Sequence, residues 1–288
     1  MKTKCNKRIS PFQELLVNIE ESFSLLLGET RNLWISLLFP IGAAIITVWI
    51  AGKDMFNNFE SSKSACFIIV CAAIWGGLFN SIQVVVKERD VIKREYTSGA
   101  LRIGCYTASR AIIQLVLCAI QSAALCLSFL AIKFVYDNPL PENGLIFTSA
   151  MVEYYITVFL IMYAADTLGL MISCFVKSEQ LASQMSPYVL IVQLLFSGVL
   201  FAMEGAASGF SALMLSRWGM EALGSISNLN DLPLQLQQEF PMIPHEADDA
   251  FLYTAAHLQE VWLILLAFVV VPLIIGNIAL HNVKKDSR

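Results

Sequence analysis

The sequence has little charge and lacks the common catalytic and nucleotide-binding motifs. Only 15% of its 288 residues are charged, whereas 57% are hydrophobic; an ordinary soluble domain carries about 25% charged residues. There is no G-x-x-x-x-G-K-[ST], H-E-x-x-H, G-x-S-x-G or G-x-G-x-x-G, and histidine occurs three times. We therefore expect no enzymatic activity, cofactor or metal site in this chain, and no nucleic-acid partner.

Long apolar runs dominate what is present. A helix needs roughly 20 apolar residues to cross the hydrocarbon core of a bilayer. Cutting the chain at its charged residues leaves six runs of that length, interrupted only by Asp166: 32–52, 64–86, 111–132, 154–176, 180–203 and 261–283. Continuous runs favour helices over barrel strands, which alternate. The sequence thus predicts an all-α integral membrane protein, with six transmembrane helices in residues 32–288 after a cytoplasmic segment, residues 1–31.

Basic residues are distributed unevenly between the segments that flank these runs. Residues 1–31, 87–110, 177–179 and 284–288 hold 15 of the 19 Lys and Arg residues. Cytoplasmic segments of membrane proteins carry an excess of such residues. The pattern predicts that both termini are cytoplasmic, in a multi-pass protein of the plasma membrane or a bacterial inner membrane.

Residues 10–30 predict an amphipathic helix ahead of the first span. Ser10 suits a helix N-cap and Pro11 the first turn. Apolar residues recur at helical spacing: Phe12, Leu15, Leu16, Ile19, Phe23, Leu26 and Leu27. The opposite face carries Glu20 and Glu21, whereas helices that adhere to anionic lipid favour Lys and Arg there. Two interpretations stay open: a surface helix that meets a partner with basic groups, or a lead-in helix solvated on one side.

The segment 87–102, KERDVIKREYTSGALR, lies between two of the apolar runs. Its density of charge excludes it from lipid, so we expect a short helix at the cytoplasmic surface. There it contacts either lipid headgroups or another protein. Gly99 fits the end of this helix, because a residue without a Cβ can turn the chain.

Residues 204–260, between the last two runs, form a divided outer region. Residues 205–216 are apolar but too few to span a bilayer, which favours a re-entrant or interfacial helix. Residues 218–226 predict a second short helix. After Asn228 the segment is rich in proline and acidic residues, which predicts an irregular acidic outer loop.

These features together resemble the membrane domains of ABC exporters of the ABC-2 permease (ABCG-like) group. The spacing E-R-x-x-x-x-R-E-x-x-x-G in residues 88–99 is similar to the coupling helix of that family. Residues 186–200, SPYVLIVQLLFSGVL, look like its fifth span, and residues 10–30 look like its connecting helix. Residues 217–233 look like bacterial members in particular. The resemblance extends over nearly the whole chain.

The resemblance implies a permease subunit that pairs with a second permease copy, identical or different, around a central path. ATP and Mg²⁺ would bind in a separate ATPase subunit or domain. The largely apolar spans, for their part, would suit a hydrophobic or amphipathic substrate, although every spanning bundle is apolar. It also implies which residues contact the ATPase or the connecting helix, with Glu20 or Glu21 opposite Arg89 or Arg94: Glu88, Arg89, Arg94, Glu95, Glu20 and Glu21. The alternative is a solvated charged turn that only enforces topology.

The resemblance further implies gate residues in the fifth span, Leu195, Phe196 and Leu200, although such side chains equally suit lipid or packing contacts. Asp166 is compatible with pairing across helices, with lining a substrate path or with carrying a proton. A proton-coupled secondary transporter using Asp166 is therefore an alternative to the exporter. A membrane scaffold that recruits cytosolic proteins through residues 10–30 and 87–102 is another.

Overall fold

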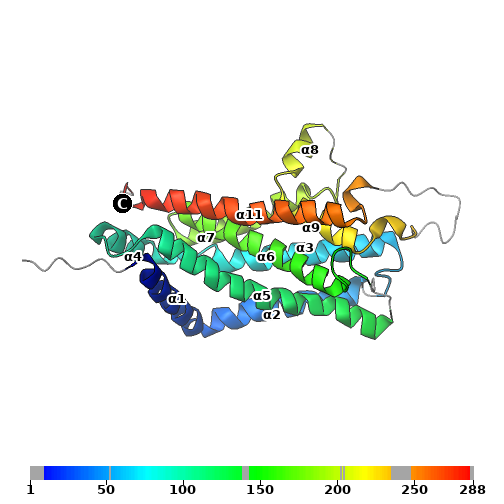
Figure 1. Ribbon diagram of the computed structural model, residues 1–288, viewed down its shortest axis with the longest axis horizontal. Helices are drawn as coiled ribbons and strands as arrows, with labels where there is room; N and C mark the ends of the chain where they lie inside the picture. The colour runs from blue at the N-terminus through cyan, green and yellow to red at the C-terminus, as the bar shows by residue number, and fades with distance from the viewer. Residues whose placement is uncertain are drawn as a thin grey trace, which may run out of the picture.

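The computed structural model describes residues 10–51, 53–137, 143–201, 203, 205–234 and 248–285. Every regular element in these residues is a helix (Figure 1), which confirms the all-α prediction. In chain order the elements are α1 (Pro11–Gly28), α2 (Thr30–Ala51), α3 (Phe59–Ser81), α4 (Val84–Ser98), α5 (Ile103–Tyr136), α6 (Ala150–Phe175), α7 (Glu179–Leu195), α8 (Ala206–Ser211), α9 (Leu215–Ile226), η1 (Leu229–Asp231), η2 (Asp249–Phe251), α11 (Ala255–His281) and η3 (Asn282–Lys285).

Five helical segments in the described residues are long and apolar enough to cross a membrane. They comprise α2, the nearly continuous α3–α4 segment, α5, α6 and α11. The helices run beyond the apolar runs of the sequence: α5 continues past Arg110 at one end and Lys133 at the other. Lys133 lies in the last turn of α5, where its long side chain can reach the membrane–water boundary, and Arg110 is paired with a carboxylate.

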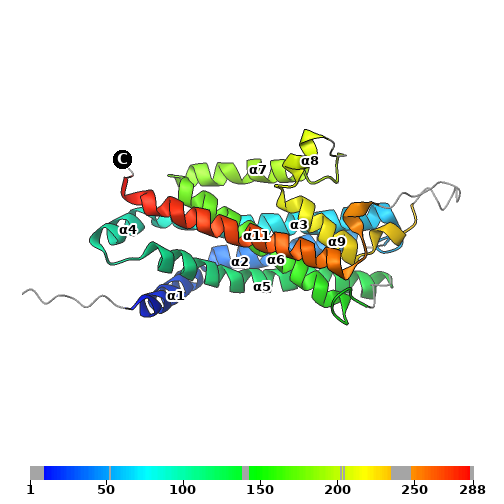
Figure 2. The same cartoon turned by 45° about the horizontal axis from the view of Figure 1, so that its top comes forward.

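The predicted fifth span, 180–203, is shorter in the structure. Helix α7 has 17 residues, about 26 Å at 1.5 Å per residue, whereas the hydrocarbon core is about 30 Å thick. The helix ends at Leu195 because Gly198 takes a φ of 78°, which other residues rarely adopt, and the Ser197 hydroxyl accepts a hydrogen bond from the Val199 amide. The structure therefore supports five of the six predicted spans. Figure 2 shows α7 and α8 along one flank of the bundle.

Helix α6 forms the centre of the bundle, packed between α3 and α11. Gly169 makes the close approach to α3 possible, because a Cβ added there would lie 2.7 Å from the Leu78 carbonyl oxygen. On its other side, Tyr154 of α6 stacks on Phe129 of α5 with ring centroids 4.2 Å apart. Helix α2 is the least buried of the five spans.

The two ends of the bundle differ in character (Figure 1). Helices α1 and α4 and the last turn of α11 gather at one end, where the Tyr96 ring meets the His281 ring edge-on at 6.0 Å. Helices α8 and α9 lie toward the other end. In the predicted outer region, α8 is only six residues long, and residues 235–247 lie outside the described part of the chain.

Helix α9 is the better packed of the two short helices. Most of its residues are buried against α3, α6 and α11. It carries an ion pair in which Arg217 Nε lies 2.8 Å from Glu221 Oε1. Burial raises the pKa of the Glu221 carboxyl above its usual range, and the neighbouring Arg217 opposes that shift. This pair satisfies the charges of an otherwise apolar helix.

Candidate functional site

The amphipathic helix α1 is fixed at its start as the sequence predicts. The Ser10 hydroxyl accepts a hydrogen bond from the Gln13 amide at 3.2 Å, and Pro11 occupies the first turn. Glu14 then ties α1 to the start of α5: its Oε1 accepts the Arg102 amide at 2.5 Å, and its Oε2 lies 3.2 Å from Arg102 Nη1. The helix is therefore held at a defined place beside the α4–α5 connection.

Much of the apolar stripe of α1 is exposed, although Leu15, Ile19 and Leu26 are half-buried. Phe12, Leu16, Phe23 and Leu27 keep 50–67% of their surface exposed. The buried residues of the helix are polar, Asn18 and Ser22, and α5 is the helix that α1 contacts most extensively. The exposed part of the stripe is compatible with an interfacial helix that places its apolar side in the bilayer.

Helix α4 is joined to the end of α6 by reciprocal capping. The amides of Val85 and Val86, at the start of α4, donate to the Ser173 hydroxyl at 3.1 and 3.2 Å. In the other direction, Arg89 Nη1 donates to the carbonyls of Cys174 and Val176 at 2.9 and 3.1 Å. Because the last carbonyls of a helix lack partners within it and carry partial negative charge, a guanidinium is well suited to that position.

A second attachment joins α4 to α5. Arg110 Nη2 lies 2.5 Å from both carboxylate oxygens of Glu88, and the Tyr106 hydroxyl donates to Glu88 Oε2 at 2.6 Å. The guanidinium of Arg110 also lies over the Tyr106 ring, 5.3 Å from its centroid. The Arg110 side chain is only 10% exposed, so water screens this ion pair weakly. Glu88 and Arg89 are therefore engaged inside the chain.

The remaining predicted contact residues face outward. Glu20, Glu21 and Arg94 are exposed and Glu95 is half-buried. Glu21 and Glu95, together with Glu88, line a cavity of about 220 Å³ between α1 and α4. We call this cavity the acidic notch. Arg110 also lines this cavity and neutralises Glu88, so Glu21 and Glu95 supply the excess negative charge that favours a positively charged occupant.

The structure does not join the pairs expected between the two helices. In the described part of the chain neither Glu20 nor Glu21 pairs with Arg89 or Arg94. Two other carboxylates form contacts between α1 and its neighbours. Glu14 pairs with Arg102, as described above, and Glu29, at the C-terminal end of α1, has its Oε2 3.5 Å from Lys87 Nζ. Sequence reasoning missed these because no spacing rule connects residues so far apart in the chain.

Asp166 lies in the α3–α6 interface and is fully buried. Its Oδ1 accepts a hydrogen bond from the Ser81 hydroxyl at 2.6 Å, while its Oδ2 is buried without a partner. It therefore joins two helices and does not line either of the two cavities described for this chain.

The three predicted gate residues lie at the end of α7 and just beyond it. Leu195 and Leu200 are 43% and 53% exposed. The ring of Phe196 meets the ring of Phe210 on α8 at 4.7 Å in an edge-to-face arrangement. The three therefore belong to the α7–α8 flank, and a gate role for them stays a prediction.

This architecture is that of a multi-pass membrane protein. It has membrane-crossing helices, and at one end an amphipathic helix lies beside them and a charged helix is capped onto them. The family model described as ABC-2 type transporter matches residues 13–226, from α1 to the end of α9. The chain belongs to this family and is the membrane domain of an ABC transporter, as the resemblance in residues 88–99 implies. A search of curated proteins finds no match.

Proposed function

We propose that this chain is the permease subunit of an ATP-driven exporter that moves a hydrophobic or amphipathic substrate. A separate ATP-binding subunit or domain docks against α1 and α4, and hydrolysis of ATP with Mg²⁺ takes place in that partner. The termini and the α1–α4 end face the cytoplasm of a bacterial-type inner membrane or a plasma membrane. Family membership over α1 to α9 supports this assignment, and the distribution of basic residues supports the orientation.

The observation that carries the proposal is the division of charges at the α1–α4 end. Glu88 and Arg89 are engaged with α5 and α6, whereas Glu20 and Arg94 are exposed and Glu21 is exposed at the acidic notch. A docking partner needs the second kind of residue. The acidic notch would receive a Lys or Arg of the ATPase, because charge-assisted hydrogen bonds exceed neutral ones in strength.

A second permease copy, identical or different, completes the transport path in this proposal. Helix α7 supports that part, because its apolar residues Leu181, Met185, Tyr188 and Ile191 are all more than 40% exposed. Pairing through α7 would bring Leu195, Phe196 and Leu200 of two copies toward a common axis.

The direct test is purification of the tagged full chain from its native membrane, followed by identification of bound proteins and an ATPase assay. We expect a P-loop ATPase in stoichiometric amount. Arg94→Ala/Glu95→Ala, which removes an exposed charge and one carboxylate of the acidic notch, should reduce recovery of the ATPase at least several-fold. The matched control is Lys133→Ala/Glu260→Ala, which removes one exposed charge of each sign at the opposite end.

Equal recovery of the ATPase with both double variants would show that docking does not use α4. Repeated preparations without an ATPase would overturn the exporter proposal. In that case proton-driven flux through Asp166, abolished by Asp166→Asn, becomes the next measurement, and a chain without flux of either kind would be a scaffold.

A further inference from the structure

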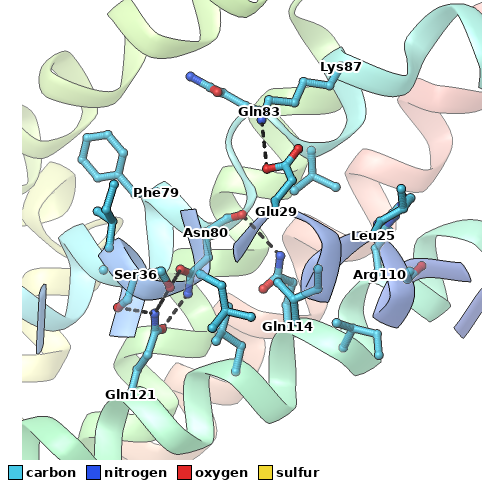
Figure 3. Close-up of a pocket in the computed structure, with 18 of the residues that line it drawn as sticks. Leu25, Glu29, Ser36, Phe79, Asn80, Gln83, Lys87, Arg110, Gln114 and Gln121 are labelled. Carbon is cyan, nitrogen blue, oxygen red and sulfur yellow. Dashed lines mark hydrogen bonds and ion pairs between the residues drawn. The ribbon is translucent and has the colours of Figure 1, made fainter. Parts of the chain in front are cut away.

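A cavity of about 730 Å³ lies between α1, α2, α3, α5 and the start of α4 (Figure 3). Ligand pockets of proteins have volumes of about 300–1,000 Å³, so the cavity is large enough for one small or single-chain molecule. It contains neither Asp166 nor the predicted gate residues. Nothing in the proposed docking of an ATPase accounts for it.

One part of the cavity wall is a polar cluster that is already satisfied (Figure 3). Asn80 Nδ2 donates to Gln121 Oε1 at 2.7 Å, and Gln121 Nε2 donates to the Ser36 carbonyl at 2.9 Å. The Ser36 hydroxyl donates to Asn80 Oδ1 at 3.1 Å. This cluster joins α2, α3 and α5 and requires no further partner.

Two polar atoms of the same wall are unsatisfied. Gln114 is 6% exposed, and its Nε2 donates to the Asn80 carbonyl at 3.3 Å, but its Oε1 is buried without a partner. Arg110 is 9% exposed, and its Nε is buried without a partner, although its Nη2 is bonded to Glu88. A buried donor or acceptor without a partner costs about 1–3 kcal/mol. Both residues line the cavity, but the two atoms are covered by neighbouring protein atoms. A change of side-chain rotamer that uncovers them would allow an occupant with both a donor and an acceptor to satisfy one acceptor and one donor, four residues apart on α5.

The charges at the cavity limit the net charge of that occupant. Arg110 is neutralised by Glu88, and Lys87, at the exposed rim, is paired with Glu29. An anionic head group would meet the two carboxylates as well as the two cations. The cavity therefore suits a head group without net charge.

The opposite wall is apolar and aromatic. Trp75 stacks on Phe79 with ring centroids 5.9 Å apart, and Phe39 lies 6.3 Å from Trp75. These three rings are 37–49% exposed, so the apolar wall continues onto the outer surface of the membrane-crossing helices. A molecule with an apolar tail can therefore enter from the lipid phase.

We propose that this cavity binds a single-chain amphiphile without net charge, whose head donates a hydrogen bond to Gln114 Oε1 and accepts one from Arg110 Nε while its tail lies along Phe39, Trp75 and Phe79. The molecule is either a membrane lipid retained by the protein or cargo taken from the adjacent leaflet. Binding rests on this chain alone, and only the cargo role rests on the proposed function.

Photolabelling of the purified full chain tests this proposal. The probe is lysophosphatidylethanolamine with a diazirine in its acyl chain, which carries an ammonium donor, a phosphate acceptor and no net charge. We expect labels on α2 and α3 around Phe39 and Trp75. Unlabelled lysophosphatidylethanolamine should compete, and lysophosphatidylglycerol, which has the same tail and one negative charge, should compete about tenfold less well.

Two variants distinguish the cavity from general contact with detergent or lipid. Gln114→Leu keeps the size of the side chain and removes the acceptor, together with the Nε2 donor that bonds the Asn80 carbonyl. It should weaken competition about tenfold, since one hydrogen bond to the ligand is worth about 1.4 kcal/mol. Ile113→Trp fills the cavity and should abolish specific labelling while every polar group stays in place. The matched control Gln184→Leu makes the same change at an exposed position of α7 and should label as the unaltered chain does.

Labels spread over exposed helices without competition would overturn the proposal, as would equal competition curves for Gln114→Leu and Gln184→Leu. The two sources of the ligand are separated with the ATP-binding partner present. Release of the bound probe on ATP addition identifies cargo, whereas occupancy that ATP does not change, with a co-purifying lipid of the same class, identifies a retained lipid. Failure to find an ATPase removes only this last comparison and leaves the labelling result intact.

Discussion

The ion pair between Glu88 and Arg110 provides the sharpest test of how α4 is held on the bundle. Glu88→Gln leaves the guanidinium of Arg110 without its counter-charge. Arg110→Met leaves the Glu88 carboxylate with only the Tyr106 hydroxyl as a partner. The double variant removes both charges together. We expect the double variant to lose less stability than the sum of the losses in the two single variants.

The magnitude follows from the exposure of the two side chains. Removing one partner of a buried ion pair costs about 3–5 kcal/mol. The Arg110 and Glu88 side chains are 10% and 26% exposed, so water compensates part of the loss. We therefore expect about 2–3 kcal/mol for each single variant, with a coupling of about 1–3 kcal/mol between them. At about 2–4 °C per kcal/mol, Tm should fall by roughly 4–12 °C.

The assay is thermal unfolding of the detergent-solubilised chain over the full double-mutant cycle. The control cycle combines Lys87→Met and Glu29→Gln. In this ion pair the Lys87 side chain is 34% exposed and the Glu29 side chain 56%, and exposed pairs couple by about 0–1 kcal/mol. If the Glu88 and Arg110 effects are additive, or if each single variant lowers Tm no more than its control, the pair does not hold α4 in place.

Three further predictions use the same unfolding assay or a transport assay. Arg89→Leu removes the cap from the end of α6 and should lower Tm by several degrees, whereas Arg94→Leu should leave Tm unchanged; equal shifts would contradict the assigned contacts. Gly169→Ala should abolish or severely reduce folded protein, because its Cβ would lie 2.7 Å from a carbonyl of α3, while Gly104→Ala, with nothing within 4 Å, should fold normally. Asp166→Asn keeps an oxygen for the Ser81 hydroxyl, so export should persist with unchanged pH dependence; loss of a pH-gradient requirement would instead support proton coupling.

The sequence predicts the spans and the helix ends where the signal is local. Ser10, Pro11 and Gly99 act at short range through caps, and Gly99 ends α4 with a φ of 76°. Apolar runs place the spans to within several residues. The early end of α7 also has a local cause, the turn at Gly198. The sequence does not reveal this end, because the residues up to Phe201 are apolar.

The site could be predicted only in part, because its contacts join residues far apart in the chain. The E-R-x-x-x-x-R-E spacing identifies the right helix without showing which charges face inward. Arg89 reaches carbonyls of α6 more than 80 residues away. Composition likewise gives no sign that Gln114 keeps an unsatisfied oxygen. Such assignments depend on how helices are arranged, which helical periodicity does not encode.

The attachments of α4 bear on how a partner could act on the membrane domain. Under the proposed function, force applied at Arg94 or in the acidic notch reaches α6 through Arg89 and Ser173, and reaches α5 through Glu88. Since α6 is the centre of the bundle, a displacement of α4 that is passed to α6 would reach the helix around which the others pack. A lever joined to the core by two ion-paired or capped contacts transmits displacement, whereas a solvated turn would absorb it. The stability cycle at Glu88 and the docking test at Arg94 therefore examine two parts of one mechanism. The first measures whether α4 is held firmly on the bundle, and the second measures whether a partner binds α4.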